Sequence, residues 1–184
     1  ALQVAWRCEP APPADLPMVF ASRHGDIRRT FGMLEGLARD EPLSPTHFGL
    51  STHNAIAAQY SITRGLTGNY SAVSAGVASV EAGVAEALGL LAEGAPAVLL
   101  VAYDGPTPEA YDGFQDEPAA AWAWAWRLEA ARGEGPAWSL EPDAASPPPG
   151  PHALPAGLET LRRVLTASPA WPSRDGRWRW TRHA

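Results

Sequence analysis

The sequence predicts an α/β layered domain with a mixed sheet packed with helices. Residues 97–102 form an unbroken apolar run, which is typical of a strand covered on both faces of its sheet. Helical periodicity alternates with short strand-like runs along the chain, and small residues fill the stretch 76–91. The 184 residues suit one core, so we expect a single domain over residues 1–184.

The N-terminal part predicts a strand, a turn and a helix. Residues 1–8 fit the end of a helix or a short strand, and the proline-rich residues 9–17 form a connector. Residues 18–21 are an apolar run that leads into a glycine-containing turn. From residue 27 onward, apolar side chains recur at helical spacing, which predicts a helix after the turn.

The middle of the chain predicts the centre of the core. A second helix is expected over about residues 51–64, where Gly65 would end it. Residues 69–75 alternate enough to form a strand, and residues 76–91 predict a helix that can be buried on almost all sides. The apolar run 97–102 then follows as the interior strand.

Three tryptophans alternate with alanines within residues 118–128, which predicts a strand with the rings on one face. Such a stripe favours packing in a core or interface over binding of an acyl or polyene chain. The three tryptophans are Trp122, Trp124 and Trp126. We expect the core of the domain to span about residues 18–128.

The last part of the chain is expected to follow a break. Six prolines between residues 141 and 155 disfavour regular structure and predict an extended, mobile loop. Residues 157–181 then predict a short amphipathic helix and a final strand, and the strand over 177–181 alternates as an edge strand does.

Composition excludes several classes of function. All 14 basic residues are arginine, which excludes lysine Schiff-base chemistry and the lysine of a P-loop. A net charge of -6 argues against nucleic acid, and no apolar run reaches the length of a membrane helix. The single cysteine, Cys8, fits a reducing compartment, so we expect a cytoplasmic protein. The histidines lack metal-ligand spacing, and we expect neither a metal nor a cofactor.

Residues 48–68 carry a pattern that belongs to a known family. Its elements are Asn54, small residues, an isoleucine and a Gly-x-x-Gly pair at the end. Residues 70–102 follow in the order strand, tight turn, buried helix and central strand. Over about residues 18–105 the chain resembles the β-ketoacyl synthases, which implies the N-terminal half of their thiolase-like layered fold.

The resemblance implies that the reactive cysteine is lost. Along the matched motif the nucleophile falls at Val77, whose side chain cannot hold an acyl thioester. The family's assisting histidines lie in a second half of the fold, for which we expect no room in this chain. The resemblance therefore implies a chain-length-factor-like subunit of type II polyketide, aryl polyene or fatty-acid-like biosynthesis, which is not an enzyme on its own.

The resemblance also implies a partner. Ketosynthases pair through the strand before the nucleophile, here residues 69–75, and the segment 46–63 would close the end of the partner's acyl tunnel. We expect a heterodimer with an active β-ketoacyl-ACP synthase, and contact with the acyl carrier protein is left open. The expected interface and tunnel-gating residues are Phe48, His53, Gln59, Tyr60, Asn69, Tyr70, Ser71, Val73 and Ala75.

Other interpretations stay open. Ser74 or Ser79 could act as a replacement nucleophile with His53 as base, in a stand-alone acyl-thioester transferase or hydrolase. The chain could instead be a homodimeric module that binds a carrier protein. His24 beside several arginines suggests an anion site, although a solvated helix start is favoured. The acidic residues between 104 and 117 are expected to form a solvated loop.

Overall fold

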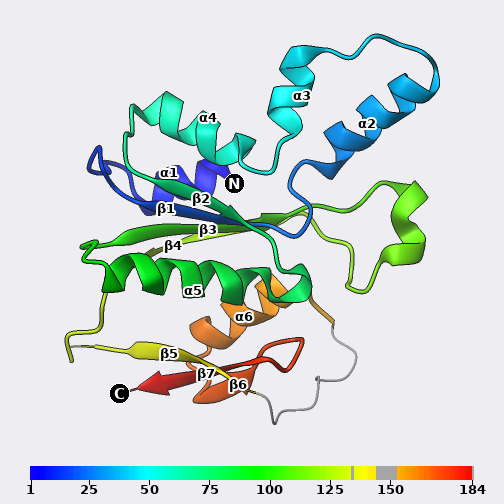
Figure 1. The fold of residues 1–184 in the computed structure, drawn as a ribbon. Coiled ribbons are helices and arrows are strands. Elements are labelled where there is room, and N and C mark those ends of the chain that lie inside the picture. Colours follow the sequence, from blue (N-terminus) through cyan, green and yellow to red (C-terminus); the bar gives the residue numbers. More distant parts are fainter. Residues whose placement is uncertain (134, 144–152, 184) are drawn as a thin grey trace.

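A four-stranded mixed sheet lies at the centre of the computed structural model, which describes residues 1–133, 135–143 and 153–183 (Figure 1). The strand order is β2-β1-β3-β4. β1 (Met18–Ala21) is parallel to both β2 (Tyr70–Val73) and β3 (Val98–Asp104), and β4 (Trp122–Leu128) is antiparallel to β3. The predicted α/β class and mixed sheet are confirmed, and β2 forms one edge of the sheet.

Helices cover both faces of this sheet (Figure 1). α1 (Leu2–Cys8) and α4 (Ala55–Arg64) lie against one face, and α5 (Ser79–Ala92) lies against the other. Each face has its own apolar cluster, and the central strand contributes alternate residues to the two. Val98, Leu100 and Ala102 face α5, whereas Leu99 and Val101 face α1 and α4. Burial on both sides explains the unbroken apolar run.

α5 packs very close to the sheet, and a glycine makes this approach possible. A Cβ atom at Gly83 would lie 2.9 Å from the Cβ of Ala21 and 3.0 Å from Cδ1 of Leu100. The first distance is shorter than real Cβ contacts and the second is unusually tight, so an added methyl group would force its neighbours to shift. The small residues predicted to allow a buried helix therefore set the distance between α5 and the strands.

The segment between β1 and α4 projects from the body of the molecule (Figure 1). α2 (Ile27–Ala38) begins after Asp26, whose side chain caps the helix, and α3 (Pro45–Ser51) begins after the capping Ser44. The single helix expected over 51–64 is therefore wrong at its start, because the chain is extended at Thr52 and α4 begins only at Ala55. Its predicted end at Gly65 is confirmed, with a left-handed φ of 63°.

A second, three-stranded sheet follows the first and covers the outer side of α5 (Figure 1). It consists of β5 (Ala137–Pro142), β7 (Trp178–His183) and β6 (Ala170–Pro172), in that order and antiparallel. With α6 (Ala156–Leu165) it forms what we call the C-terminal unit. η1 (Gly76–Ala78) and η2 (Glu109–Phe114) are short 3-10 helices that follow β2 and β3.

Two expectations for this unit were wrong. The final strand is not an edge strand, because β7 pairs with β5 on one side and with β6 on the other. Regular structure also continues to Glu141 and Pro142, which end β5, so the predicted break begins later. The rest of the proline-rich loop, residues 144–152, lies outside the described residues.

The tryptophans join the two sheets. Trp124 of β4 is buried, and its indole N–H donates to the carbonyl of Gly157 in α6 at 3.0 Å. Its ring centroid lies 4.1 Å from that of Trp126, which in turn meets Trp180 of β7 edge to face. The stripe therefore packs between β4 and the C-terminal unit.

Candidate functional site

The open edge of β2 is the first part of the candidate site. The backbone N–H groups of Met18 in β1 and of Ser22 just after it donate to the carbonyl oxygens of Asn69 and Val73. Because backbone groups alternate in direction along a strand, those of Tyr70 and Ala72 point away from β1. They are free to pair with a further strand, as unpaired edges in proteins tend to do.

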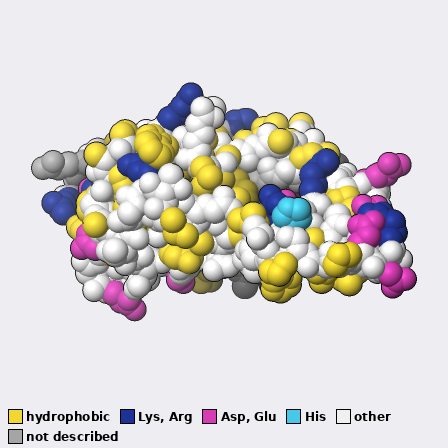
Figure 2. Space-filling model, turned by 90° about the horizontal axis from the view of Figure 1, so that it is seen from above, with side chains coloured by type: hydrophobic (Ala, Val, Ile, Leu, Met, Phe, Trp, Pro, Cys, Tyr) yellow, Lys and Arg dark blue, Asp and Glu magenta, His cyan; other side chains and the backbone are white. Residues whose placement is uncertain are grey.

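Apolar side chains lie on both helices beside this edge. α4 and α5 contact β2 from opposite faces of the sheet. Ile62 of α4 is 81% exposed and Leu88 of α5 is 43% exposed, while Tyr70 itself is 37% exposed. On the face that carries α2, α3 and α4, hydrophobic side chains recur across the surface and acidic ones lie mainly toward its ends (Figure 2).

The predicted interface residues divide into two groups. Phe48 is exposed on α3, and Asn69 and Ala75 are exposed at the two ends of β2. Gln59 is half-buried on α4. Tyr60, in contrast, is only 2% exposed, because its ring packs toward Phe20 of β1 at 6.2 Å between centroids. Tyr60 is a core residue of this chain, and its role as a gate of a partner's tunnel stays a prediction.

The remaining members of the predicted set bond within the chain. Ser71 donates to Oε1 of Glu86 on α5 at 2.8 Å, and Val73 packs against the cluster under α5. Nε2 of His53 lies 2.9 Å from the carbonyl oxygen of Ser22. His53 is therefore tied to the turn after β1 rather than to a serine hydroxyl.

Val77 lies in η1, in the sharp connection between β2 and α5 that begins at Gly76 with φ at 58°. A small hollow of about 230 Å³ lies beside it. Trp122 lines this hollow and packs so closely on α6 that a Cβ at Gly157 would lie 2.1 Å from the ring. Side chains of the chain itself, among them Trp122 and Glu117, therefore line the space next to Val77.

The two candidate serines are committed to the backbone. Ser74 donates to the carbonyl of Arg23 at 2.9 Å, and Ser79 donates to the carbonyl of Gly76 at 2.7 Å. Within the described residues, neither hydroxyl has a histidine as hydrogen-bond partner. Cys8 is a poor nucleophile as well, since burial raises the pKa of its thiol. The geometry does not support a serine or cysteine enzyme.

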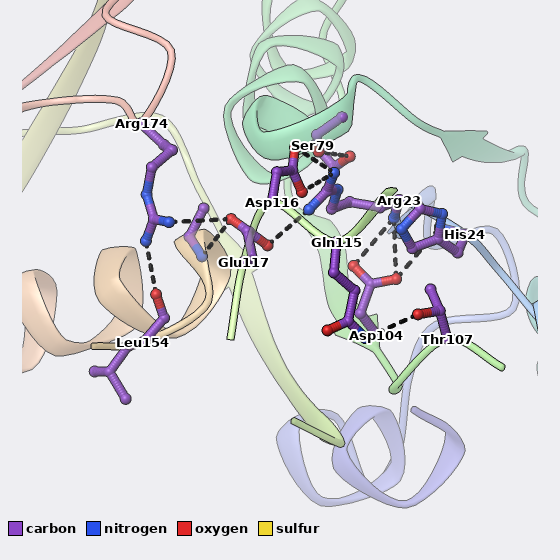
Figure 3. A network of polar contacts seen from close by, with 12 residues as sticks. Arg23, His24, Ser79, Asp104, Thr107, Gln115, Asp116, Glu117, Leu154 and Arg174 are labelled. Atoms are coloured by element: carbon purple, nitrogen blue, oxygen red, sulfur yellow. Dashed lines mark hydrogen bonds and ion pairs between the residues drawn. The ribbon is translucent and has the colours of Figure 1, made fainter. Parts of the chain in front are cut away.

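A network of charged groups lies at the carboxyl ends of β1 and β3 (Figure 3). Asp104 accepts from the hydroxyl of Ser22 at 2.8 Å and from the backbone N–H of Arg23 at 3.1 Å. Arg23 pairs with Asp116 at 2.9 Å and with Glu117 at 3.0 Å. Burial raises the pKa of Asp104, although the N–H donors oppose this shift.

This network corrects one expectation. The acidic stretch is not simply a solvated loop, because three of its carboxylates hold the turn after β1 and the start of α6. The alternative of an anion site beside His24 is weakened, because Arg23 and Arg29 pair with carboxylates of the chain and Arg28 donates to the carbonyl of Pro106. The favoured interpretation, a solvated helix start, agrees with the exposed position of His24.

Glu81 is a feature that sequence reasoning missed. This glutamate is 2% exposed within α5, and its Oε1 accepts from Nε1 of Trp180 at 3.0 Å and from the hydroxyl of Thr160 at 3.2 Å. Burial raises the pKa of its carboxyl group. The available signal was an acidic residue near the start of a helix made mostly of small and apolar residues. Glu81 attaches α5 to both α6 and β7.

Metal ligands and membrane spans were searched in the part of the chain that the structure describes. There, no group of three or more histidine, cysteine, aspartate or glutamate side chains could hold a metal ion. Among the same residues, no helix has the length and apolar character needed to cross a membrane.

Comparisons with known proteins agree with this geometry. The family model described as β-ketoacyl synthase, N-terminal domain, matches residues 1–181. A solved structure of the ketosynthase ApeO in complex with its chain length factor ApeC, from Xenorhabdus doucetiae, contains a similar chain. The two chains are 28% identical with a TM-score of 0.83, and the match covers 100% of this chain and 75% of the other. A search of curated proteins finds no match.

Proposed function

This chain belongs to the β-ketoacyl synthase N-terminal domain family, with its thiolase-like fold, and from that premise we propose that it is a noncatalytic, chain-length-factor-like subunit. It pairs with an active β-ketoacyl-ACP synthase and shapes the acyl tunnel of that partner. The pathway is of the type II polyketide kind, in polyene or fatty-acid-like biosynthesis, and we place the subunit in the cytoplasm.

The observation that carries this proposal is the identity of residue 77, a valine, which the resemblance places at the nucleophile position. An acyl-enzyme needs a thiol or hydroxyl that a base can activate, and Val77 offers neither. The neighbouring serines donate to backbone carbonyls, and His53 bonds to the carbonyl of Ser22. The fold is kept while the chemistry of this half is missing, as expected of a subunit that acts through a partner.

The edge of β2 supports the proposed pairing. Parallel pairing with β1 uses one side of the strand, so the outward backbone groups of Tyr70 and Ala72 can bond to a strand of the ketosynthase. Ile62 and Leu88 on the flanking helices would be buried at the same time. The similar solved structure holds a ketosynthase together with its chain length factor, which supports the choice of partner.

Phe48 is the best candidate for limiting the length of the acyl chain. It is 61% exposed on α3, a helix with no buried residue, so its side chain is available to a partner. A bulky ring at the end of an apolar tunnel discriminates by volume. Each methylene forced into a closed pocket costs on the order of 1–3 kcal/mol, which is enough to set a cutoff.

The test is the product profile of the co-expressed complex. Phe48→Ala should lengthen the main product, while Phe114→Ala is the control, since Phe114 is also a strongly exposed ring, on η2. Unchanged product length with both Phe48→Ala and Gln59→Ala would overturn the gating role. Pairing with the ketosynthase is tested separately, by whether the two subunits form a complex.

The open edge of β2 also favours a second candidate, a homodimer that binds a carrier protein. A second copy could occupy the same edge, because unpaired strands are sticky regardless of the partner. Sedimentation of the isolated chain distinguishes the two. A dimer that persists when the ketosynthase is added supports the second candidate, and exchange into a mixed dimer supports the first.

A further inference from the structure

A pocket in the C-terminal unit is independent of the pairing edge. It is an open pocket that lies between α6 and the β6–β7 turn. Its lining combines apolar groups with two guanidinium groups. The residues that matter here are Trp171, Pro172, Arg163 and Arg174.

The hydroxyl groups of this pocket are already committed, but several donors are not. Thr160 donates to Glu81, and Ser173 donates to Asp175. Arg163 uses its Nε to bond Glu159, which leaves its two terminal nitrogens for a ligand. The indole N–H of Trp171 is buried and has no hydrogen-bond partner among the described residues, while the ring is 5% exposed and lines the pocket.

A buried donor without an acceptor is uncommon and costly, so it calls for an explanation. Arg174 adds a second incompletely satisfied group. Its side chain is 11% exposed, one terminal nitrogen donates to the carbonyl of Leu154, and the other lies 3.6 Å from Glu117 (Figure 3). That distance is longer than a good charged hydrogen bond, and burial lowers the pKa of Arg174.

The charges around the pocket leave one positive charge without a partner. Glu159 pairs with both Arg162 and Arg163, and Glu117 is shared between Arg23 and Arg174. Asp116 pairs with Arg23. Of the charged groups that line the pocket itself, two are guanidinium groups, Arg163 and Arg174, and one is a carboxylate, Glu159, which favours a ligand with a single negative charge.

We propose that this pocket binds a small monocarboxylate with a short apolar chain. The carboxylate accepts hydrogen bonds from the terminal nitrogens of Arg163 and Arg174 and from the indole N–H of Trp171, and the apolar part lies against the Trp171 ring and Pro172. Guanidinium groups suit this task because their planar donors match the two carboxylate oxygens. The proposal does not depend on the pairing with a ketosynthase.

The test is a titration of the full chain with hexanoate, followed by the tryptophan indole N–H signals in NMR spectra. The signal of Trp171 is identified by its loss in Trp171→Phe. We expect this signal to shift and saturate, and Arg163→Gln to weaken binding about tenfold, which corresponds to about 1.4 kcal/mol. Arg162→Gln is the matched control, because Arg162 bonds the same Glu159 but does not line the pocket.

Hexanol and inorganic phosphate are the comparison probes. The proposal is overturned if hexanoate gives no saturating shift of the Trp171 signal, or if Arg163→Gln and Arg162→Gln bind hexanoate equally well. Hexanol that binds as tightly as hexanoate would remove the role of the charge, and phosphate that does so would replace the carboxylate with a simple anion. The side chains of Arg162 and Arg163 are both about half exposed, so the two variants are expected to fold.

Discussion

Two glycines of α5 allow a direct test of how this helix packs on the sheet. Gly83 faces β1 and β3, where an added Cβ would lie 2.9 Å from Ala21 Cβ and 3.0 Å from Leu100 Cδ1. Gly89 lies two turns later in the same helix, and an added Cβ there meets nothing within 4 Å. Gly83→Ala and Gly89→Ala therefore make the same chemical change with and without a collision.

The expected magnitudes follow from this pair. Glycine to alanine in a helix gains about 1 kcal/mol of helix propensity, and this gain is common to both variants. Only Gly83→Ala also forces a methyl group into a filled space, and overpacking of this kind costs about 1–3 kcal/mol. The Ala21 Cβ is fixed to its strand and cannot move aside. The difference between the variants should therefore be about 1–3 kcal/mol, with Gly89→Ala the more stable.

Urea unfolding and thermal melting measure this difference. For a chain of this size, each kcal/mol changes the melting temperature by about 2–4 °C. Gly89→Ala should melt above the parent protein and Gly83→Ala below Gly89→Ala. Equal stability of the two variants would refute the close packing of α5 on the sheet.

Two further predictions concern Glu81 and the open edge. The pKa of Glu81 is raised in the folded state, so the folded protein keeps a proton that the unfolded chain loses near the ordinary value of 4.5; the free energy of unfolding therefore falls as the pH rises above 4.5 toward the raised pKa. Glu81→Gln should remove this fall. Urea unfolding of both proteins between about pH 5 and about pH 8 measures it, and the same pH dependence in both would contradict the prediction. Ala72→Pro should abolish pairing with the ketosynthase, because it removes the backbone N–H of residue 72, which points away from β1; the hydrogen bonds between β1 and β2 stay intact. Ala72→Val keeps this N–H group and should still pair. Size-exclusion chromatography of the mixed subunits measures the pairing of both variants.

The central elements could be predicted because their sequence signals are local. The strand over residues 97–102 is apolar at every position, and the structure buries both of its faces. Gly65 ended the predicted helix where it ends α4, since only a residue that tolerates positive φ fits there. The family match rested on the same part of the chain, which includes Val77.

The C-terminal unit could not be predicted to the same extent because its strands depend on distant partners. β6 has only three residues, and it is a strand because β7 pairs with it. β7 alternates in sequence as an edge strand does, yet β5 covers its second side. Long-range pairing of this kind leaves no periodic signal in a short segment.

Side-chain roles in the candidate site were harder still. Tyr60 and Gln59 are neighbours on the same helix, and only the tertiary structure places one in the core and leaves the other half-buried. The acidic residues after β3 look like a solvated run, yet Arg23 lies far away in sequence and pairs with two of them. Such ion pairs between distant segments are set by the fold and not by local spacing.

The central claim is that this chain acts as the noncatalytic partner of a ketosynthase. Native mass spectrometry of the chain co-expressed with the β-ketoacyl-ACP synthase of its own pathway tests it most directly. The account predicts a one-to-one complex in which only the ketosynthase carries an acyl group, since Val77 cannot hold one. Two separate species, or an acyl group on this chain, would contradict the account.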